Sequence, residues 1–345
     1  MTSEYYTHYE IKLDLHADVA DWNRNEGREE LLAVGTYELD ETTQMRHGAL
    51  YTFSHSTGDT PLKQERRVMD LPGIFDLQWV PGSLCESSTM VAVAFADGSV
   101  QFMDALSNDG KTLSTPSNDG AMALTVDTVQ HKGSLMCASS YSDGCVNVFQ
   151  VAPDRIERIQ NWQAHSLEAW VSVWSRSRDS IGSIVYSGGD DALFQAWDIR
   201  DASQEPSRVF LDKKTHQAGV CWITEVESHP HMILTGSYDQ NIRVWDWRST
   251  ARPVCTSQCD TGGGVWRIKP HPKDSTLLLT ACMYNGFLVY RIDEKDNEVN
   301  IVECEHYPYQ QTLAYGASWS QHGVVATCSF YDNLLHVWSP KTTPR

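Results

Sequence analysis

Apolar and polar residues alternate over short runs along the chain, and Gly, Asp, Asn or Pro turns separate these runs. Examples are "MVAVAFADGSVQFMD" at 90–104, "LMCASSYSDGCVNVFQV" at 135–151 and "TLLLTACMYNGFLVYRI" at 276–292. A period of two residues is typical of β-strands with one face against a core, whereas helices repeat every 3.6 residues. The pattern therefore predicts an all-β protein built from many short strands.

The strands recur in units of nearly constant length. Two units contain a Trp-Asp pair, and in both a turn residue stands six positions before the Trp. In the six aligned units this turn position is occupied by Asp97, Asp143, Asp191, Asp239, Asn285 and Asp332. The successive steps between these positions are 46, 48, 48, 46 and 47 residues. A fixed period of this size indicates a repeat architecture in which each unit contributes about four strands.

Seven units fit the chain. Six units follow one another from about residue 65 onward. The first 60 residues hold another, with "ELLAVGTYELD" and "GALYTFS" as inner strands. Seven four-stranded units predict one seven-bladed β-propeller domain over 1–345, because closing the ring leaves only short, protected edges. We expect blades at about 11–56, 65–104, 112–151, 157–199, 207–248, 253–292 and 299–339. A strand at about 5–12 is expected to close the last blade.

Two units carry a His ahead of the first strand, a turn Asp and a Trp-Asp pair. These residues are His165, Asp191 and Trp197 in one unit, and His216, Asp239 and Trp245 in the other. Both units resemble the WD-repeat family, in which His, Asp and Trp form a buried hydrogen-bonded network that braces each blade. The resemblance implies a structural role for all six residues, in preference to Ser/His/Asp catalysis.

The composition indicates which partners the protein can bind and in which compartment it works. Lys and Arg number 27 against 45 Asp and Glu, a net charge of −18, which repels nucleic acid and anionic membranes and attracts basic partners. No apolar run approaches the roughly 18 residues of a membrane span, and the N-terminus lacks the pattern of a secretory signal. Nine scattered cysteines, with no Cys-x-x-Cys pair, fit reduced thiols and no metal site. We expect a cytoplasmic monomer.

Some stretches go beyond the blade pattern. They are "WQAHSLEAWVSVW" at 162–174, "DTGGGVWRIKPHP" at 260–272 and "LAYGASWS" at 313–320. With "YSGGDD", "TGSYD" and "LLLTACMYNGF", they resemble the diphthine methylesterase family of WD-repeat proteins, most strongly over about 160–320. The resemblance implies a carboxylic ester hydrolase without a cofactor. Its substrate would be methylated diphthine on a His of translation elongation factor 2, in diphthamide biosynthesis.

Aromatic residues recur at one position of the innermost strands, which line the channel of a propeller. Counting back four residues from Trp79, Trp174 and Trp319, and taking the residue after Val265, gives Phe75, Trp170, Tyr315 and Trp266. Aromatic faces attract quaternary ammonium ions by about 0.5–2 kcal/mol each. Diphthine carries such a group, so the expected substrate-binding residues are Trp170, Trp266, Tyr315, Tyr238 and Tyr284. The alternative interpretation is that these rings only pack between neighbouring sheets.

Ester hydrolysis needs a nucleophile or an activated water and a group that holds the oxyanion. No Gly-x-Ser-x-Gly elbow occurs in the chain. Glu168 or Asp190 could serve as a general base, and Cys221 as a nucleophile or simply as a small strand residue. Arg267 or the amides of 262–264 could hold the oxyanion, although Arg267 follows Trp266 and should point to the other side of its strand. The sequence leaves this choice open.

The rival function is a non-catalytic WD-repeat scaffold or adaptor that binds protein partners through the face of the propeller. A reader of methylated lysine would use the same aromatic chemistry, but it would not account for the "GGVWRI" and "EAW" stretches.

Overall fold

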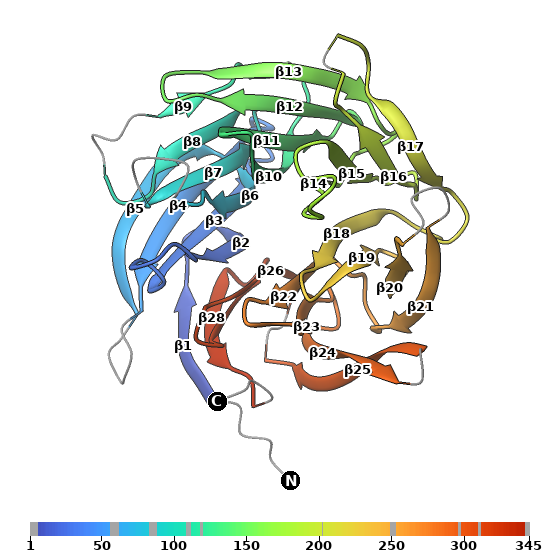
Figure 1. Ribbon diagram of the computed structural model, residues 1–345. Coiled ribbons are helices and arrows are strands. Elements are labelled where there is room, and N and C mark those ends of the chain that lie inside the picture. Colours follow the sequence, from blue (N-terminus) through green and yellow to red (C-terminus); the bar gives the residue numbers. More distant parts are fainter. Residues whose placement is uncertain are drawn as a thin grey trace.

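Seven four-stranded antiparallel sheets surround a central axis (Figure 1). The structure is a computed structural model that describes residues 6–55, 62–82, 88–107, 112–117, 120–201, 203–248, 253–295, 298–309 and 312–341. The all-β, seven-bladed propeller expected from the sequence is confirmed. Within the described residues, no helix has the length and apolar character needed to cross a membrane.

The first four sheets follow one another around the ring, and the strands of each run in order from the axis outward. The first contains β2 (His16–Trp22), β3 (Leu31–Leu39), β4 (Arg46–Ser54) and β5 (Lys63–Pro72). The second contains β6 (Ile74–Trp79), β7 (Met90–Phe95), β8 (Val100–Asp104) and β9 (Leu113–Ser114). The third contains β10 (Ala123–His131), β11 (Ser134–Tyr141), β12 (Cys145–Val151) and β13 (Ile156–Gln163). The fourth contains β14 (Val171–Trp174), β15 (Ile184–Gly188), β16 (Phe194–Asp198) and β17 (Ser207–Asp212).

The last three sheets complete the ring. The fifth contains β18 (Val220–Val226), β19 (His229–Ser237), β20 (Asn241–Asp246) and β21 (Val254–Asp260). The sixth contains β22 (Arg267–His271), β23 (Asp274–Ala281), β24 (Phe287–Lys295) and β25 (Glu298–Tyr307). The seventh contains β26 (Ala314–Trp319), β27 (Val325–Ser329) and β28 (Leu334–Ser339), with β1 (Tyr6–Lys12) as its outer strand.

The two ends of the chain share the seventh sheet. Strand β1 pairs antiparallel with β28, with Ile11 opposite Leu335 and Lys12 opposite Leu334 (Figure 1). The sheets and the units counted along the sequence are offset by one strand. For example, β13 belongs to the sheet that begins at β10, whereas the unit expected at 157–199 began with it. The repeat fixes the period but not the phase, because in a closed ring any strand can be counted first.

Most of the core lies between neighbouring sheets. Every residue of β7 except the first is buried, because both faces of the sheet are covered by other blades. Between the sixth and seventh sheets, Leu279 and Phe287 pack in one cluster with Trp319 and Trp338. Two buried faces explain why several inner strands read as continuous apolar runs rather than as strict alternation.

Polar side chains on the innermost strands join each blade to the next. Asp21 Oδ2 accepts a hydrogen bond from the backbone N–H of Trp79 at 3.3 Å, and Asp127 Oδ2 accepts one from that of Trp174 at 2.8 Å. Ser318 Oγ donates to Asp21 Oδ1 at 3.0 Å and so links the seventh blade to the first. The first two of these bonds satisfy buried backbone donors on the neighbouring blade.

The fourth blade contains a continuous His-centred network. Trp197 Nε1 donates to Ser187 Oγ at 2.9 Å, and Ser187 Oγ lies 2.9 Å from His165 Nε2. The other ring nitrogen, Nδ1, lies 2.8 Å from Asp191 Oδ1. The network ties the loop before β14 to the turn after β15, the arrangement that the sequence resemblance implied for this blade.

In the fifth blade the equivalent His and Asp have separate partners instead of contacting each other. His216 Nε2 lies 2.9 Å from Thr235 Oγ1, and its Nδ1 faces Asp212 at 3.7 Å. Asp239 instead forms a buried ion pair with Arg243 at 2.8 Å. The expected link from His216 to Asp239 is therefore not formed, because an Arg four residues along the chain takes the carboxylate.

We expect His165→Ala to destabilise the fold more than His216→Ala. Removing His165 takes one hydrogen-bond partner from Asp191 and one from Ser187, at a cost of about 1–3 kcal/mol, whereas Asp239 keeps Arg243 when His216 is removed. Urea unfolding of both variants measures the difference, with the exposed His47→Ala as control. An equal or larger loss for His216→Ala would contradict the network described for the fourth blade.

Candidate functional site

One residue of each blade occupies the same place at the beginning of the innermost strand. In blade order these residues are Asp18, Phe75, Leu124, Trp170, Cys221, Trp266 and Tyr315. In five blades the strand register shifts there by one residue, and in the other two the residue directly precedes the strand. A β-bulge turns a side chain away from its regular direction. The channel mouth is therefore built from seven equivalent positions.

Aromatic rings form a continuous arc at this mouth. Trp266 stacks on Tyr315 with ring centroids 4.8 Å apart and meets the edge of Trp170 at 5.6 Å. Tyr238, from the turn after β19, lies 6.0 Å from each of the two tryptophans. On the other side, Tyr315 lies 5.2 Å from Phe330.

The arc continues onto the first two blades. Tyr37 lies 4.9 Å from Phe330 and 4.7 Å from Phe75. We use the name aromatic arc for the connected set Trp170, Tyr238, Trp266, Tyr315, Phe330, Tyr37 and Phe75. The structure thus brings together Trp170, Trp266, Tyr315 and Tyr238, which the sequence proposed as one site, and adds Phe330 and Tyr37, which it did not single out.

Most rings of the arc are half-buried, so part of their surface remains open to a ligand. Burial raises the pKa of the Tyr238 and Tyr315 phenols well above the ordinary value. Both hydroxyls therefore stay protonated at neutral pH and can donate hydrogen bonds. Tyr284 differs from these residues, since its side chain is 85% exposed after the end of β23.

Asp190 holds one ring of the arc in place. Trp170 Nε1 donates to Asp190 Oδ1 at 2.9 Å, and the backbone N–H of Asp190 donates to the carbonyl of Glu168 at 2.8 Å. A Cβ at Gly219 would lie 2.7 Å from Asp190 Oδ1, so the chain passes close to the carboxylate only because glycine stands there. Asp190 thus orients the indole of Trp170, and its own backbone is fixed by that of Glu168.

Arg267 is held by partners on the second blade. Its guanidinium is buried and forms an ion pair with Asp76 Oδ1 at 2.6 Å, and it also donates to the carbonyl of Phe75 at 3.0 Å. This pair connects the sixth blade to the second. The neighbouring glycines serve close packing, since a Cβ at Gly263 would lie 2.2 Å from the carbonyl of Cys282. The expected oxyanion role of Arg267 therefore does not fit its position.

Cys221 occupies the equivalent position of the fifth blade but is 3% exposed. Its Sγ lies 3.4 Å from the carbonyl of Gly219. Burial raises the pKa of the thiol well above its usual range. The uncharged thiol is a weak nucleophile, so this environment supports the role of a small strand residue.

Asp18 is the member of the mouth that the sequence reasoning missed. It lies at the bulge of β2 with 1% exposure, and its Oδ2 has no hydrogen-bond partner among the described residues. Burial raises the pKa of this carboxyl to about 8, against the opposing effect of the Arg267 charge. Counting back four residues from Trp22 would have found it, as it found Phe75 from Trp79.

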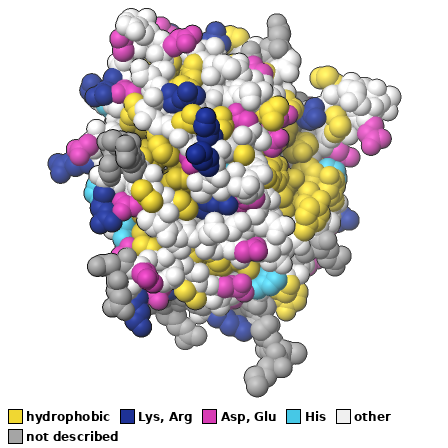
Figure 2. Space-filling model, turned by 90° about the vertical axis from the view of Figure 1, so that its right-hand side faces the viewer, with side chains coloured by type: hydrophobic (Ala, Val, Ile, Leu, Met, Phe, Trp, Pro, Cys, Tyr) yellow, Lys and Arg dark blue, Asp and Glu magenta, His cyan; other side chains and the backbone are white. Residues whose placement is uncertain are grey.

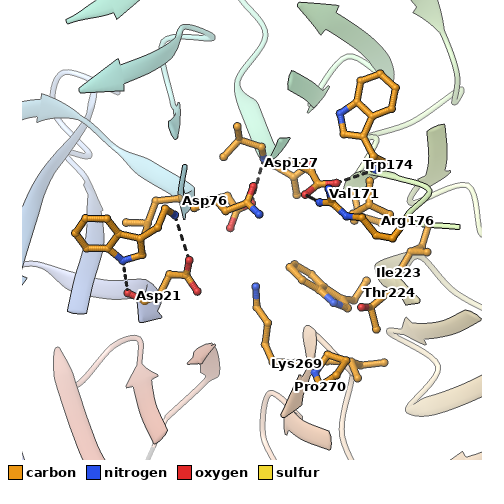
Figure 3. Close-up of a pocket in the computed structure, with 18 of the residues that line it drawn as sticks. Asp21, Asp76, Asp127, Val171, Trp174, Arg176, Ile223, Thr224, Lys269 and Pro270 are labelled. Carbon is orange, nitrogen blue, oxygen red and sulfur yellow. Dashed lines mark hydrogen bonds and ion pairs between the residues drawn. The ribbon is translucent and has the colours of Figure 1, made fainter. Parts of the chain in front are cut away.

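A cavity of about 380 Å³ lies farther along the innermost strands (Figure 3). Later residues of the innermost strands line it, including Asp21, Asp127 and Arg176. Lys269 extends into its middle, with Nζ 4.6 Å from the Trp222 ring centre, and burial lowers the pKa of its amine. Acidic and basic groups are mixed in this cavity, whereas the mouth is aromatic.

The outer surface mixes charges as well. Figure 2 shows one side of the disc, on which acidic and basic side chains alternate around patches of hydrophobic ones. In the part of the chain that the structure describes, no group of three or more His, Cys, Asp or Glu side chains is placed to hold a metal ion.

Comparisons with known proteins identify WD repeats and a group of related enzymes. Residues 205–246 match the WD domain, G-beta repeat family. The chain is 30% identical to the diphthine methyltransferase of Homo sapiens, covering 90% of this chain and 74% of that one, and 31% identical to that of Mus musculus, covering 90% and 68%. The chain belongs to the diphthine methyltransferase family. The member from Saccharomyces cerevisiae is 29% identical, with 90% of this chain and 93% of that one covered.

A solved structure supports the fold. A chain in the crystal structure of the mitotic checkpoint complex superposes with a TM-score of 0.73 at 16% identity, covering 99% of this chain and 94% of that one. At this level of identity the likeness concerns the propeller alone.

One expectation from the sequence, the class of enzyme, is wrong. The resemblance implied a carboxylic ester hydrolase, whereas the family members from Homo sapiens, Mus musculus and Saccharomyces cerevisiae are all named methyltransferases. Methyl transfer therefore replaces ester hydrolysis as the chemistry associated with the family. With this correction, no oxyanion holder and no hydrolytic nucleophile need be sought among Arg267 and Cys221.

We expect Cys221 to resist thiol reagents at neutral pH, because its sulfur is buried and protonated. Cys304, which is exposed on β25, should react first. Mass spectrometry of peptides after a timed pulse with iodoacetamide compares the two cysteines in the same sample. Labelling of Cys221 at the rate of Cys304 in folded protein would restore it as a nucleophile.

Proposed function

We propose that the protein acts in diphthamide biosynthesis by binding methylated diphthine on translation elongation factor 2 and taking part in transfer of its methyl group. In this proposal the aromatic arc holds the trimethylammonium end of the side chain. The observation that carries the proposal is that four aromatic rings from the fourth to the seventh blade lie within contact distance of one another. They are the rings of Trp170, Tyr238, Trp266 and Tyr315.

The chemistry of the arc suits a quaternary ammonium group. Such a cation cannot donate hydrogen bonds, so it is recognised through the negative faces of aromatic rings. Half-buried rings provide these faces while excluding much of the competing water. Asp190 adds a carboxylate beside Trp170, and Glu168 lies in the loop that leads to it, so negative charge further favours a cation at the mouth.

The position of the arc also suits a protein substrate. The rings lie where the innermost strands begin, at one end of the channel, so a modified side chain can enter without its polypeptide following. A net charge of −18 favours basic surroundings on the partner. Every cysteine that the structure describes is unpaired, which supports the reducing environment of the cytoplasm.

The proposal is tested by incubating the purified protein with elongation factor 2 that carries methylated diphthine. Mass spectrometry of the modified peptide should show a change equal to one methyl group, in proportion to the amount of protein added. An unchanged peptide mass in the presence of folded protein would sink the proposal and favour the non-catalytic scaffold.

We expect Trp266→Ala to weaken use of this substrate by about 2- to 30-fold, the equivalent of about 0.5–2 kcal/mol for one cation–π partner. Trp266→Phe should recover part of the loss, because it keeps an aromatic face. The outer-strand variant Val209→Ala is the matched surface control, and a melting curve for each variant separates binding from stability. Unchanged turnover in folded Trp266→Ala would remove the arc from the substrate site.

Asp190→Ala should also lower substrate use, because it removes both the charge and the acceptor that orients Trp170. Asp190→Asn keeps an acceptor oxygen and should retain more activity than Asp190→Ala. Initial rates at several substrate concentrations test this order. The reverse order would mean that Asp190 does not act through the Trp170 indole.

A further inference from the structure

We propose that Asp18 is the anionic group beneath the aromatic arc that binds the quaternary ammonium of the substrate. This inference rests on the proposed function and names the charged residue that sets its specificity. It would divide recognition between aromatic faces, which accept any large cation, and one buried carboxylate, which makes a neutral side chain of the same shape a poor ligand.

The register places Asp18 with the arc. It is the first-blade counterpart of Trp266 and Tyr315, and the strand pairing of β2 skips it between Ala17 and Val19. Burial raises the pKa values of Tyr37 and Tyr315, and the charge of Asp18 is the next cause of the rise in both, in agreement with its register position at the mouth.

The carboxyl of Asp18 is unusual among the acids of the channel. Asp21 accepts hydrogen bonds from Ser318 Oγ and from the Trp79 backbone, and Asp76 is paired with Arg267. Asp18 is equally buried but has an oxygen without any partner in the described chain. Leaving a buried carboxyl oxygen without a hydrogen bond costs stability. A quaternary ammonium cannot donate that hydrogen bond, but its positive charge can stabilise the carboxylate.

The groups that face Asp18 from the surrounding strands do not neutralise it. They are Tyr37, Tyr315, Cys328, Asp76 and Arg267. Only the guanidinium of Arg267 is cationic, and its hydrogen bonds go to Asp76 and to the Phe75 carbonyl. Burial therefore dominates, and the empty site favours the protonated acid at neutral pH.

A cation in the arc reverses this balance. A trimethylammonium group near Asp18 stabilises the carboxylate, and the proton leaves to solvent as the cation binds. No covalent bond to carbon changes in this exchange, and the total charge of the site is conserved. Binding should consequently release a proton and become tighter as the pH rises toward the pKa of Asp18.

The test uses tetramethylammonium as the probe and the full-length protein, titrated by calorimetry. Because Asp18 has a pKa of about 8 in the empty site, affinity for the cation should rise about tenfold from about pH 7 to about pH 9 and then level off. Titrations in two buffers of different ionisation enthalpy count the proton released by the wild-type chain. Asp18→Asn should bind the probe weakly and with no pH dependence, while the exposed Asp179→Asn should behave as wild type.

The outcomes separate this inference from the proposed function. Affinity of the wild-type chain that does not change with pH and releases no proton would overturn the role of Asp18, as would an Asp18→Asn profile identical to that of wild type. Absence of any binding of the probe by wild type would overturn it too. The mass change on elongation factor 2, measured with wild-type protein, decides the proposed function independently. Proton counting needs no variant, so the inference stays testable if Asp18→Asn fails to fold.

Discussion

The pairing of β1 with β28 is the constraint on which the rest of this structure depends. It is an antiparallel ladder between the two ends of the chain, and it converts a row of seven sheets into a closed ring. Closure packs the first and seventh sheets against each other and buries both faces of most inner strands, so only the short outer edge of each blade remains. It also brings the seventh blade against the first, where Ser318 and Asp21 complete the polar links along the channel.

The candidate site follows from that closure. Asp18 and Phe330 lie near opposite ends of the sequence, yet both reach the same mouth because the first and seventh blades are neighbours in the ring. The aromatic arc crosses this junction through Phe330 and Tyr37, whose rings lie 4.9 Å apart. An open row of blades would leave the two halves of the arc on separate edges, so stability and binding depend on the same ladder.

The fold and five of the seven residues of the arc were accessible from the sequence for a physical reason. A strand period and a repeat length of 46 to 48 residues fix the number of blades, and counting from a Trp fixes one position in each blade. Phe75, Trp170 and Tyr315 were found in this way, and Trp266 was found from its place after the aligned Val265. Phe330 and Tyr37 lie at the ends of other strands and contribute no repeat signal. Asp18 does occupy the repeated position, four residues before Trp22. It was missed because the first blade was identified from its next two strands, "ELLAVGTYELD" and "GALYTFS", and not from Trp22.

The partners of charged residues were not accessible in the same way. Arg267 and Asp76 are 191 positions apart in the chain, and only the closed ring shows that they form a pair across the channel. Asp239 has two nearby candidates, His216 and Arg243, and the choice depends on side-chain geometry. The class of enzyme came from a resemblance rather than from any residue pattern, and the names of the relatives corrected it.

The central claim is that the channel mouth recognises a positive charge on a modified His. It is tested most directly by comparing the affinity of the protein for two peptides, one carrying methylated diphthine and one carrying its neutral isostere with a tert-butyl group in place of trimethylammonium. The account predicts tighter binding of the cationic peptide, because size and shape are matched and only the charge differs. Equal affinity for the two peptides would contradict it.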